Sequence, residues 1–273
     1  MRRGDDQAEW VDLINGILGA DGFALEESGR LSGHPVYAVS KRSGGVGGRP
    51  KNLIFAANGP KPELGLGDAL NNDVVILKHA EHCLVYDDWI PDEGLLWMDL
   101  VNWWSGLSGG ERDVPCVRQA LGNRLLLSLA SEAERNLFRE YFRQFIAVLQ
   151  DALPALIPQV YLHYDPLTIR QLRARGDGKR FPVHRMDFLL LLPGRARVVL
   201  EVDGKQHYSE GEGAVVRPSP KRYAETVVSD RLLRLAGYEV YRFGGYELVD
   251  EARVKDVIGQ FMTTLFRRHG VLK

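Results

Sequence analysis

The sequence predicts a mixed α/β protein in two parts, with a sheet covered by helices in the second part. Helix-like spacing of apolar residues occurs at 10–18, 131–152 and 251–268. Apolar runs of strand length lie between the last two of these, at 160–164, 185–192, 197–203 and 239–243. A Gly- and Ser-rich stretch at 105–110 separates the two parts and is the expected domain boundary.

The first part, residues 1–110, is expected to form a smaller α+β domain. It opens with a helix in which one buried stripe follows the i, i+3, i+4, i+7, i+8 pattern, namely Trp10, Leu13, Ile14, Ile17 and Leu18. Short strand-like runs follow at 36–39, 53–56 and 83–86, and a second helix is predicted at 95–104.

The second part, residues 111–273, begins with a long helix from Ser131 to about Ala152, in which apolar residues recur every four positions. A strand at 160–164 and two strands joined by the turn at 193–196 come next. Ser219 is suited to cap the following helix, with Pro220 at its first position and Gly237 just past its end. A strand at 239–243 and a final helix at 251–268 complete the order.

The chain of 273 residues has a net charge of −1 that hides an asymmetry. Residues 1–113 hold 10 basic and 18 acidic side chains, a net of −8, and residues 114–273 hold 25 and 18, a net of +7. A basic second part predicts a polyanion-binding surface there. Two cysteines are too few for a disulfide scaffold, and the sequence offers neither a membrane-length apolar run nor a signal core, so a cytoplasmic location without a membrane partner is expected.

Three acidic residues lie on the two strands joined at 193–196. If that turn is centred at Gly194, residues whose numbers sum to 388 face each other, which pairs Asp187 with Glu201. Asp203 shares a face with Glu201 because side chains alternate along a strand. Carboxylates this close repel one another unless a cation neutralises them, and oxygen ligands suit Mg²⁺ or Mn²⁺. Asp187, Glu201 and Asp203 are therefore candidate metal ligands.

Such a cluster fits phosphodiester hydrolysis, which needs an activated water and charge neutralisation at phosphorus. The alternative is that Asp187 and Glu201 simply face solvent. The large apolar residues that flank them favour the site, because strands of this composition tend to be covered on both faces. Lys205, Gln206 and His207 follow directly, and each is a candidate for orienting the attacking water or stabilising the transition state.

Glu134 has two interpretations. Ser131 and Glu134 match the capping pattern S-x-x-E, which requires no catalytic role. Glu134 would also stand at the start of the long helix, from which it could reach the carboxylate cluster.

Basic residues precede the Asp187 strand and are candidates for phosphate contact, namely Arg170, Arg173, Arg175, Lys179, Arg180 and Arg185. The alternative is an ordinary solvated loop. Arg242, on the later strand, is a weaker candidate of the same kind. His79, His82 and Cys83 lack a fourth ligand at zinc-like spacing, so the sequence does not predict a zinc site.

Three segments resemble the PD-(D/E)XK nuclease superfamily, in the branch similar to very-short-patch-repair endonucleases. They are RMDF at 185–188, EVDGKQHY at 201–208, and the stretch from Asp230 through GYEVYRF at 237–243; SEAERNLF at 131–138 also resembles that branch's opening helix. The resemblance covers about residues 118–248. It implies a restriction-endonuclease-like domain with metal-dependent endonuclease activity, and it implies an active-site role for Glu134. The superfamily pattern expects Lys where this chain has Asp203, and Lys205 or Gln206 could replace it.

The first part, from Leu53 to Trp104, resembles the abortive-infection (AbiJ) type N-terminal domain, which accompanies effectors of bacterial anti-phage systems. The two resemblances together imply a Mg²⁺-dependent DNA endonuclease controlled by a sensing domain, which a signal or a partner protein would engage. An RNA substrate and a catalytically inactive nucleic-acid-binding module are the alternatives, and a homo-oligomer is left open.

Overall fold

The computed structural model describes residues 4–18, 23–31, 34–41, 53–60, 62–68, 73–88, 90–91, 93–107, 113–162, 184–204, 209–210 and 217–273. The chain divides into two compact units, Met1–Gly45 and Val46–Lys273. This division lies well before the boundary expected at 105–110, and the sheet of the second unit explains the difference.

The first unit consists of helix α1 (Gly4–Leu18) and a hairpin of β1 (Phe23–Leu31) and β2 (His34–Lys41). The Asn15 side chain joins the helix to β1, because its Oδ1 accepts from the Leu25 N–H at 2.6 Å. The expected buried stripe is wrong for Trp10, Leu13 and Ile17, which are 53, 58 and 67% exposed. A lone two-stranded hairpin offers too little apolar surface to cover a helix face.

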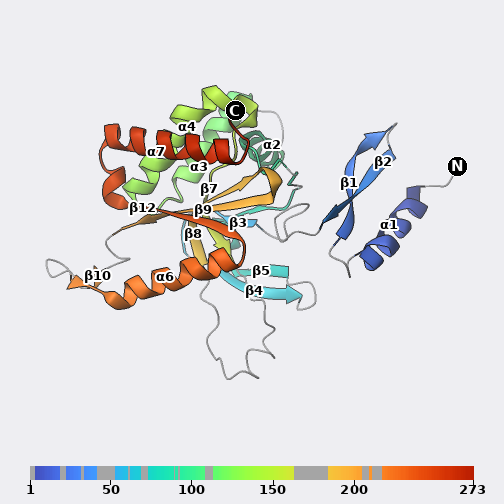
Figure 1. The fold of residues 1–273 in the computed structure, drawn as a ribbon, viewed down its shortest axis with the longest axis horizontal. Coiled ribbons are helices and arrows are strands. Elements are labelled where there is room, and N and C mark those ends of the chain that lie inside the picture. The colour runs from blue at the N-terminus through green and yellow to red at the C-terminus, as the bar shows by residue number, and fades with distance from the viewer. Residues whose placement is uncertain are drawn as a thin grey trace, which may run out of the picture. The chain divides into compact units, whose positions relative to one another are not determined.

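A mixed six-stranded sheet forms the centre of the second unit, in the order β12-β9-β8-β7-β3-β6 (Figure 1). Its strands are β3 (Leu53–Phe55), β6 (Leu84–Tyr86), β7 (Ile157–Leu162), β8 (His184–Leu192), β9 (Ala196–Asp203) and β12 (Tyr238–Gly244). β12 runs parallel to β9, and the other neighbours are antiparallel. Two strands from the expected front domain, β3 and β6, thus extend the sheet of the expected back domain.

Helices cover both faces of this sheet. Figure 1 shows α4 and α7 on one side of it and α6 on the other. In the described part of this unit the helices are α2 (Trp97–Leu107), α3 (Val114–Leu126), α4 (Glu132–Leu149), α6 (Pro220–Leu235) and α7 (Glu251–Arg268). The mixed α/β class predicted from the sequence is confirmed, with six α-helices in the described residues. Small hairpins add β4 (Glu63–Asp68) with β5 (Asp73–Lys78) and β10 (Ser209–Glu210) with β11 (Arg217–Pro218).

The helix boundaries follow the local signals in the sequence. The Ser131 and Ser219 hydroxyls accept from the backbone N–H groups three residues on, at the starts of α4 and α6. Gly237 has a φ of +86°, as expected for the residue that follows a helix end. Among the residues that the structure describes, no helix combines the length and the apolar composition needed to cross a membrane.

The segment before α2 connects the N-terminal and C-terminal parts of the second unit through backbone hydrogen bonds. The Leu95 N–H donates to the Leu191 carbonyl at 3.1 Å, and the Leu95 carbonyl accepts from the Ala155 N–H at 2.8 Å. Gly94 makes this approach possible, since its φ is +91° and a Cβ on it would lie 2.1 Å from the Leu191 oxygen. Residues near 95 therefore belong to the same core as the central hairpin.

A candidate carboxylate centre on the central strands

The register of β8 and β9 is the one predicted from the sequence. Phe188 pairs with Leu200 and Leu192 with Ala196, so paired residue numbers sum to 388. The turn between the strands carries Gly194 in the left-handed region, at a φ of +69°. Because side chains alternate, Asp187 before Phe188 and Glu201 after Leu200 both project to the face opposite to that pair. Continued by one residue beyond its last pair, this register places Asp187 and Glu201 on the same face, as the sequence predicted.

Two further residues extend the pair of Asp187 and Glu201 into a row that runs across the sheet. On one side, β7 pairs Pro158 with Phe188 and Val160 with Met186, which sets Gln159 opposite Asp187. On the other side, β12 pairs Arg242 with Glu201. The row thus reads Gln159, Asp187, Glu201, Arg242 across four adjacent strands.

Asp187 lies where β8 and β9 cease to pair. The register of the two strands ends at Phe188 and Leu200, and beyond it the Asp187 Oδ2 accepts from the Val202 N–H at 2.9 Å. The side chain is only 6% exposed. Burial, followed by the negative charge of Glu134, raises the pKa of Asp187 to about 6, although the Val202 hydrogen bond opposes the rise.

Glu201 is buried beside it. Burial and the charge of Asp187 raise the pKa of Glu201 well above its ordinary value, and the Arg242 guanidinium acts in the opposite direction. Both acids would be stabilised in their ionised forms by a further positive charge. Buried carboxylate oxygens of this kind are the ligands that Mg²⁺ and Mn²⁺ prefer, so the donor set fits the expected cation.

Glu134 satisfies both interpretations of its sequence pattern. Its backbone N–H donates to the Ser131 hydroxyl at 3.1 Å, as in a helix cap. Its carboxylate is nevertheless 4% exposed and close enough to raise the pKa of Asp187. Oε2 accepts from the Ala130 N–H at 3.0 Å and from the Gln159 side chain at 2.7 Å. The helix cap and the approach to the cluster therefore use the same side chain.

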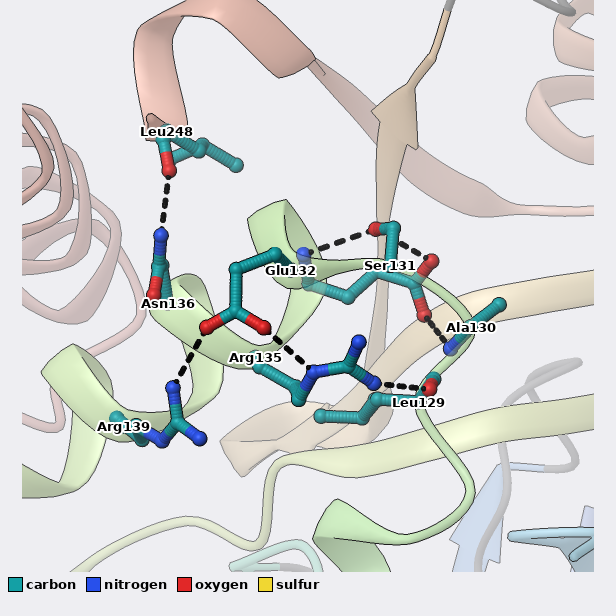
Figure 2. A network of polar contacts seen from close by, with 9 residues as sticks. Leu129, Ala130, Ser131, Glu132, Arg135, Asn136, Arg139 and Leu248 are labelled. Carbon is teal, nitrogen blue, oxygen red and sulfur yellow. Dashed lines mark hydrogen bonds and ion pairs between the residues drawn. The ribbon is translucent and has the colours of Figure 1, made fainter. Parts of the chain in front are cut away.

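The polar contacts around the first turns of α4 fix this position (Figure 2). Glu132 accepts from Arg135 at 2.8 Å and from Arg139 at 2.9 Å, and Arg135 also donates to the Leu129 carbonyl. Asn136 donates to the Leu248 carbonyl at 2.9 Å, which ties α4 to the segment after β12. These side-chain contacts stabilise the first turns of α4.

Asp203 forms an ion pair with Arg242, and its expected role as a third metal ligand stays a prediction. Its Oδ1 lies 2.7 Å from Arg242 Nη1, and Arg242 Nη2 lies 2.6 Å from Asp230 on α6. Although burial opposes its charge, the bond to Asp230 and the charges of Asp203 and Glu201 raise the pKa of Arg242. Asp187, Glu201 and Asp203, all within the described residues, do not bring three oxygens within 4.8 Å of one another. Asp203 is thus a partner of Arg242 at the rim of the pair formed by Asp187 and Glu201.

The remaining candidates are only partly placed. Lys205, Gln206 and His207 lie outside the described residues, as do Arg170, Arg173, Arg175, Lys179 and Arg180. Arg185 is described and exposed on β8, where it hydrogen-bonds Tyr161. Arg242 faces two aspartates and not open solvent, with a side chain that is 21% exposed.

Gln159 and Asp230 were missed as site residues by the sequence reasoning. Gln159 is 1% exposed and has a left-handed backbone, with a φ of +51°. A lone Gln in an apolar strand gives no signal until the register of β7 with β8 is known. Asp230 belonged to a segment of the nuclease resemblance, but only its contact with Arg242 shows what it does.

Searches against protein-family models, curated proteins and solved structures returned no match for the chain.

Proposed function

We propose that the protein is a metal-dependent endonuclease that hydrolyses phosphodiester bonds of DNA. The observation that carries the proposal is the pair of buried acids, Asp187 and Glu201, on one face of adjacent central strands. Two buried carboxylates that repel one another are costly to maintain without a function. Glu134 and Gln159 on one side and Arg242 on the other support this pair.

The proposed roles follow from these positions. Asp187 and Glu201 would hold Mg²⁺ or Mn²⁺. When bound, the ion would neutralise charge on the scissile phosphate and lower the pKa of a water molecule. Hydrolysis adds the water oxygen to phosphorus and breaks the bond to one sugar oxygen, which leaves with a proton. Gln159 would orient Glu134, and Arg242 would balance the charge of Glu201 and Asp203.

The substrate and setting are part of the same proposal. The net charge of +7 on residues 114–273 favours a polyanionic substrate. The basic residues between 170 and 185 and the groups at 205–207 would supply phosphate contacts and a substitute for the Lys of the superfamily pattern. The resemblance of residues 53–104 to an abortive-infection domain supports a cytoplasmic role in anti-phage defence.

A plasmid-nicking assay tests the chemistry. We expect purified protein to nick supercoiled DNA with Mg²⁺ or Mn²⁺ and not with EDTA. Asp187→Asn and Glu201→Gln should each lower the rate by at least about 100-fold, because each replaces a charged carboxylate ligand of the cation with a neutral amide. Asp256→Asn, at an exposed position on α7, is the matched control and should cut like wild type. Equal cleavage by all three variants would refute the site.

A second candidate function is nucleic-acid binding without cleavage. It is favoured by the Arg242–Asp203 ion pair, which occupies the position where the superfamily pattern has Lys. It requires salt-sensitive binding of DNA or RNA with no divalent-dependent product. Running DNA and RNA substrates under identical ionic conditions separates this function from DNA cleavage and from RNA cleavage.

A further inference from the structure

A second group of metal-binding side chains lies far along the chain from the carboxylate pair, between β5 and β6. His79, Glu81 and His82 each present a donor atom, and these atoms all lie within 4.8 Å of one another. His79 precedes a short 3-10 helix, Ala80–His82, whose tight turn brings together three ligands from only four consecutive residues. The sequence did not predict a zinc site here because His79, His82 and Cys83 lack a fourth ligand at zinc-like spacing, and Glu81 was not considered.

The two imidazole rings have a separation suited to sharing an ion. Their centroids are 6.1 Å apart and their planes are inclined at 37°. With a metal–nitrogen bond of about 2 Å, two imidazoles on one ion have centroids roughly 5–6 Å apart. His82 Nε2 and Glu81 Oε1 are 3.5 Å apart, so the carboxylate stands beside the ring nitrogen. Binding an ion would therefore require the side chains to rotate until all three donors reach one centre.

Hydrogen bonds from other segments of the chain hold the backbone of this turn in place. The His82 carbonyl accepts from the Asn58 N–H at 2.9 Å and from Arg124 Nη2 at 2.8 Å. The His82 ring packs against Gly59, where a Cβ would lie 2.8 Å from the imidazole. His79 has a left-handed backbone, with a φ of +65°, which is uncommon for a residue other than glycine. The turn therefore presents its ligands from a preformed frame.

We propose that His79, Glu81 and His82 form a reversible site for a transition-metal ion of the Zn²⁺ class, separate from the carboxylate centre. Two imidazole nitrogens with one carboxylate suit Zn²⁺ better than Mg²⁺, which prefers oxygen ligands. Three protein ligands leave a coordination position for water or an outside group. Glu81 is 69% exposed, so the ion can exchange with solvent. Cys83 does not belong to this group, and its Sγ donates instead to the His79 carbonyl at 3.8 Å.

Zinc binding to metal-free protein, measured by calorimetry with ZnCl₂ and by the visible absorption of added Co²⁺, tests the proposal. We expect a zinc site, distinct from any ion held by Asp187 and Glu201, that His79→Ala, His82→Ala and Glu81→Gln each weaken on the order of 100-fold. Glu81→Gln is the decisive variant, because His82 also packs against Gly59 whereas Glu81 is exposed. Unchanged thermal unfolding of each variant without zinc shows that it is folded.

The controls separate this site from the rest of the chain. His34→Ala, at an exposed position on β2, and Cys83→Ser should bind zinc like wild type, and Glu201→Gln should keep the affinity of the His79, Glu81 and His82 site even if zinc uptake at the carboxylate centre falls. No zinc uptake by wild type, or equal affinity in Glu81→Gln and wild type, would overturn the three-ligand assignment. Loss of the site in Glu201→Gln would overturn its independence from the carboxylate centre.

Discussion

Replacing Asp187 with Asn should make the metal-free protein more stable at pH 7.5. Asp187 is 6% exposed, and its pKa is raised from an ordinary value of 3.8 to about 6, chiefly by burial and then by the charge of Glu134. Ionising it in the folded protein therefore costs free energy that the unfolded chain does not pay. Asn is isosteric, and its amide oxygen can still accept the Val202 N–H.

The size of the effect follows from the two pKa values. The difference between 3.8 and about 6, at about 1.4 kcal/mol for each pH unit, corresponds to about 3 kcal/mol. Because the pKa is raised on folding, the stability linked to this proton is fully present below pH 3.8 and is lost as the pH rises through about 6. The amide NH₂ needs its own partner, so we expect a gain of about 1–3 kcal/mol for Asp187→Asn at pH 7.5.

Urea unfolding in EDTA, at pH 4 and at pH 7.5, measures this gain. The variant should exceed wild type at pH 7.5, and the advantage should shrink towards zero at pH 4. Added Mg²⁺ should stabilise wild type more than the variant, because the ion removes the same penalty. Asp256→Asn, which is exposed, should show neither effect. A variant that is less stable than wild type at pH 7.5, or an advantage that does not depend on pH, would refute the reasoning.

Two further substitutions test the frame of the site and of the fold. Gln159→Leu removes the 2.7 Å hydrogen bond to Glu134 and leaves a buried carboxylate short of a donor. We therefore expect the free energy of unfolding in urea to fall by about 1–3 kcal/mol and nicking to slow at least about tenfold. A variant as stable as wild type would contradict that contact. Gly94→Ala would place a methyl 2.1 Å from the Leu191 oxygen at a φ of +91°, so we expect a loss of at least about 3 kcal/mol. Gly106→Ala is the matched control within α2, where an added Cβ meets nothing within 4 Å. Its melting temperature should be unchanged or slightly higher than that of wild type. Equal melting temperatures for the two alanine variants would argue against the close approach of Gly94 to Leu191.

Much of the second unit could be predicted because its signals are local. Ser219 and Pro220 start α6, Gly237 follows its end, and the predicted final helix, 251–268, coincides with α7. The register of β8 and β9, from Phe188 with Leu200 to Leu192 with Ala196, followed from the turn alone, since a hairpin with a fixed centre leaves no freedom in pairing. These features depend on contacts between residues close in the chain.

The features that were not predicted depend on distant contacts. No local sequence signal predicts that β3 pairs with β7 at Ile54 and Tyr161. This pairing places strands from both expected domains in one sheet. Gln159 enters the row only because β7 lies next to β8. The ion pair of Asp203 with Arg242, a guanidinium on a third strand, likewise has no local signal in the sequence. Periodicity cannot identify such partners, because they come from segments far apart in the sequence.

Crystals grown with Mn²⁺, measured for anomalous scattering, test the central assignment most directly. We expect a peak within about 2.5 Å of carboxylate oxygens of both Asp187 and Glu201, and we expect it to vanish in Glu201→Gln. A second peak at His79 and His82 would be independent of that result. Anomalous maps that show no ion between Asp187 and Glu201 at saturating Mn²⁺ would contradict the assignment of these acids as a metal centre.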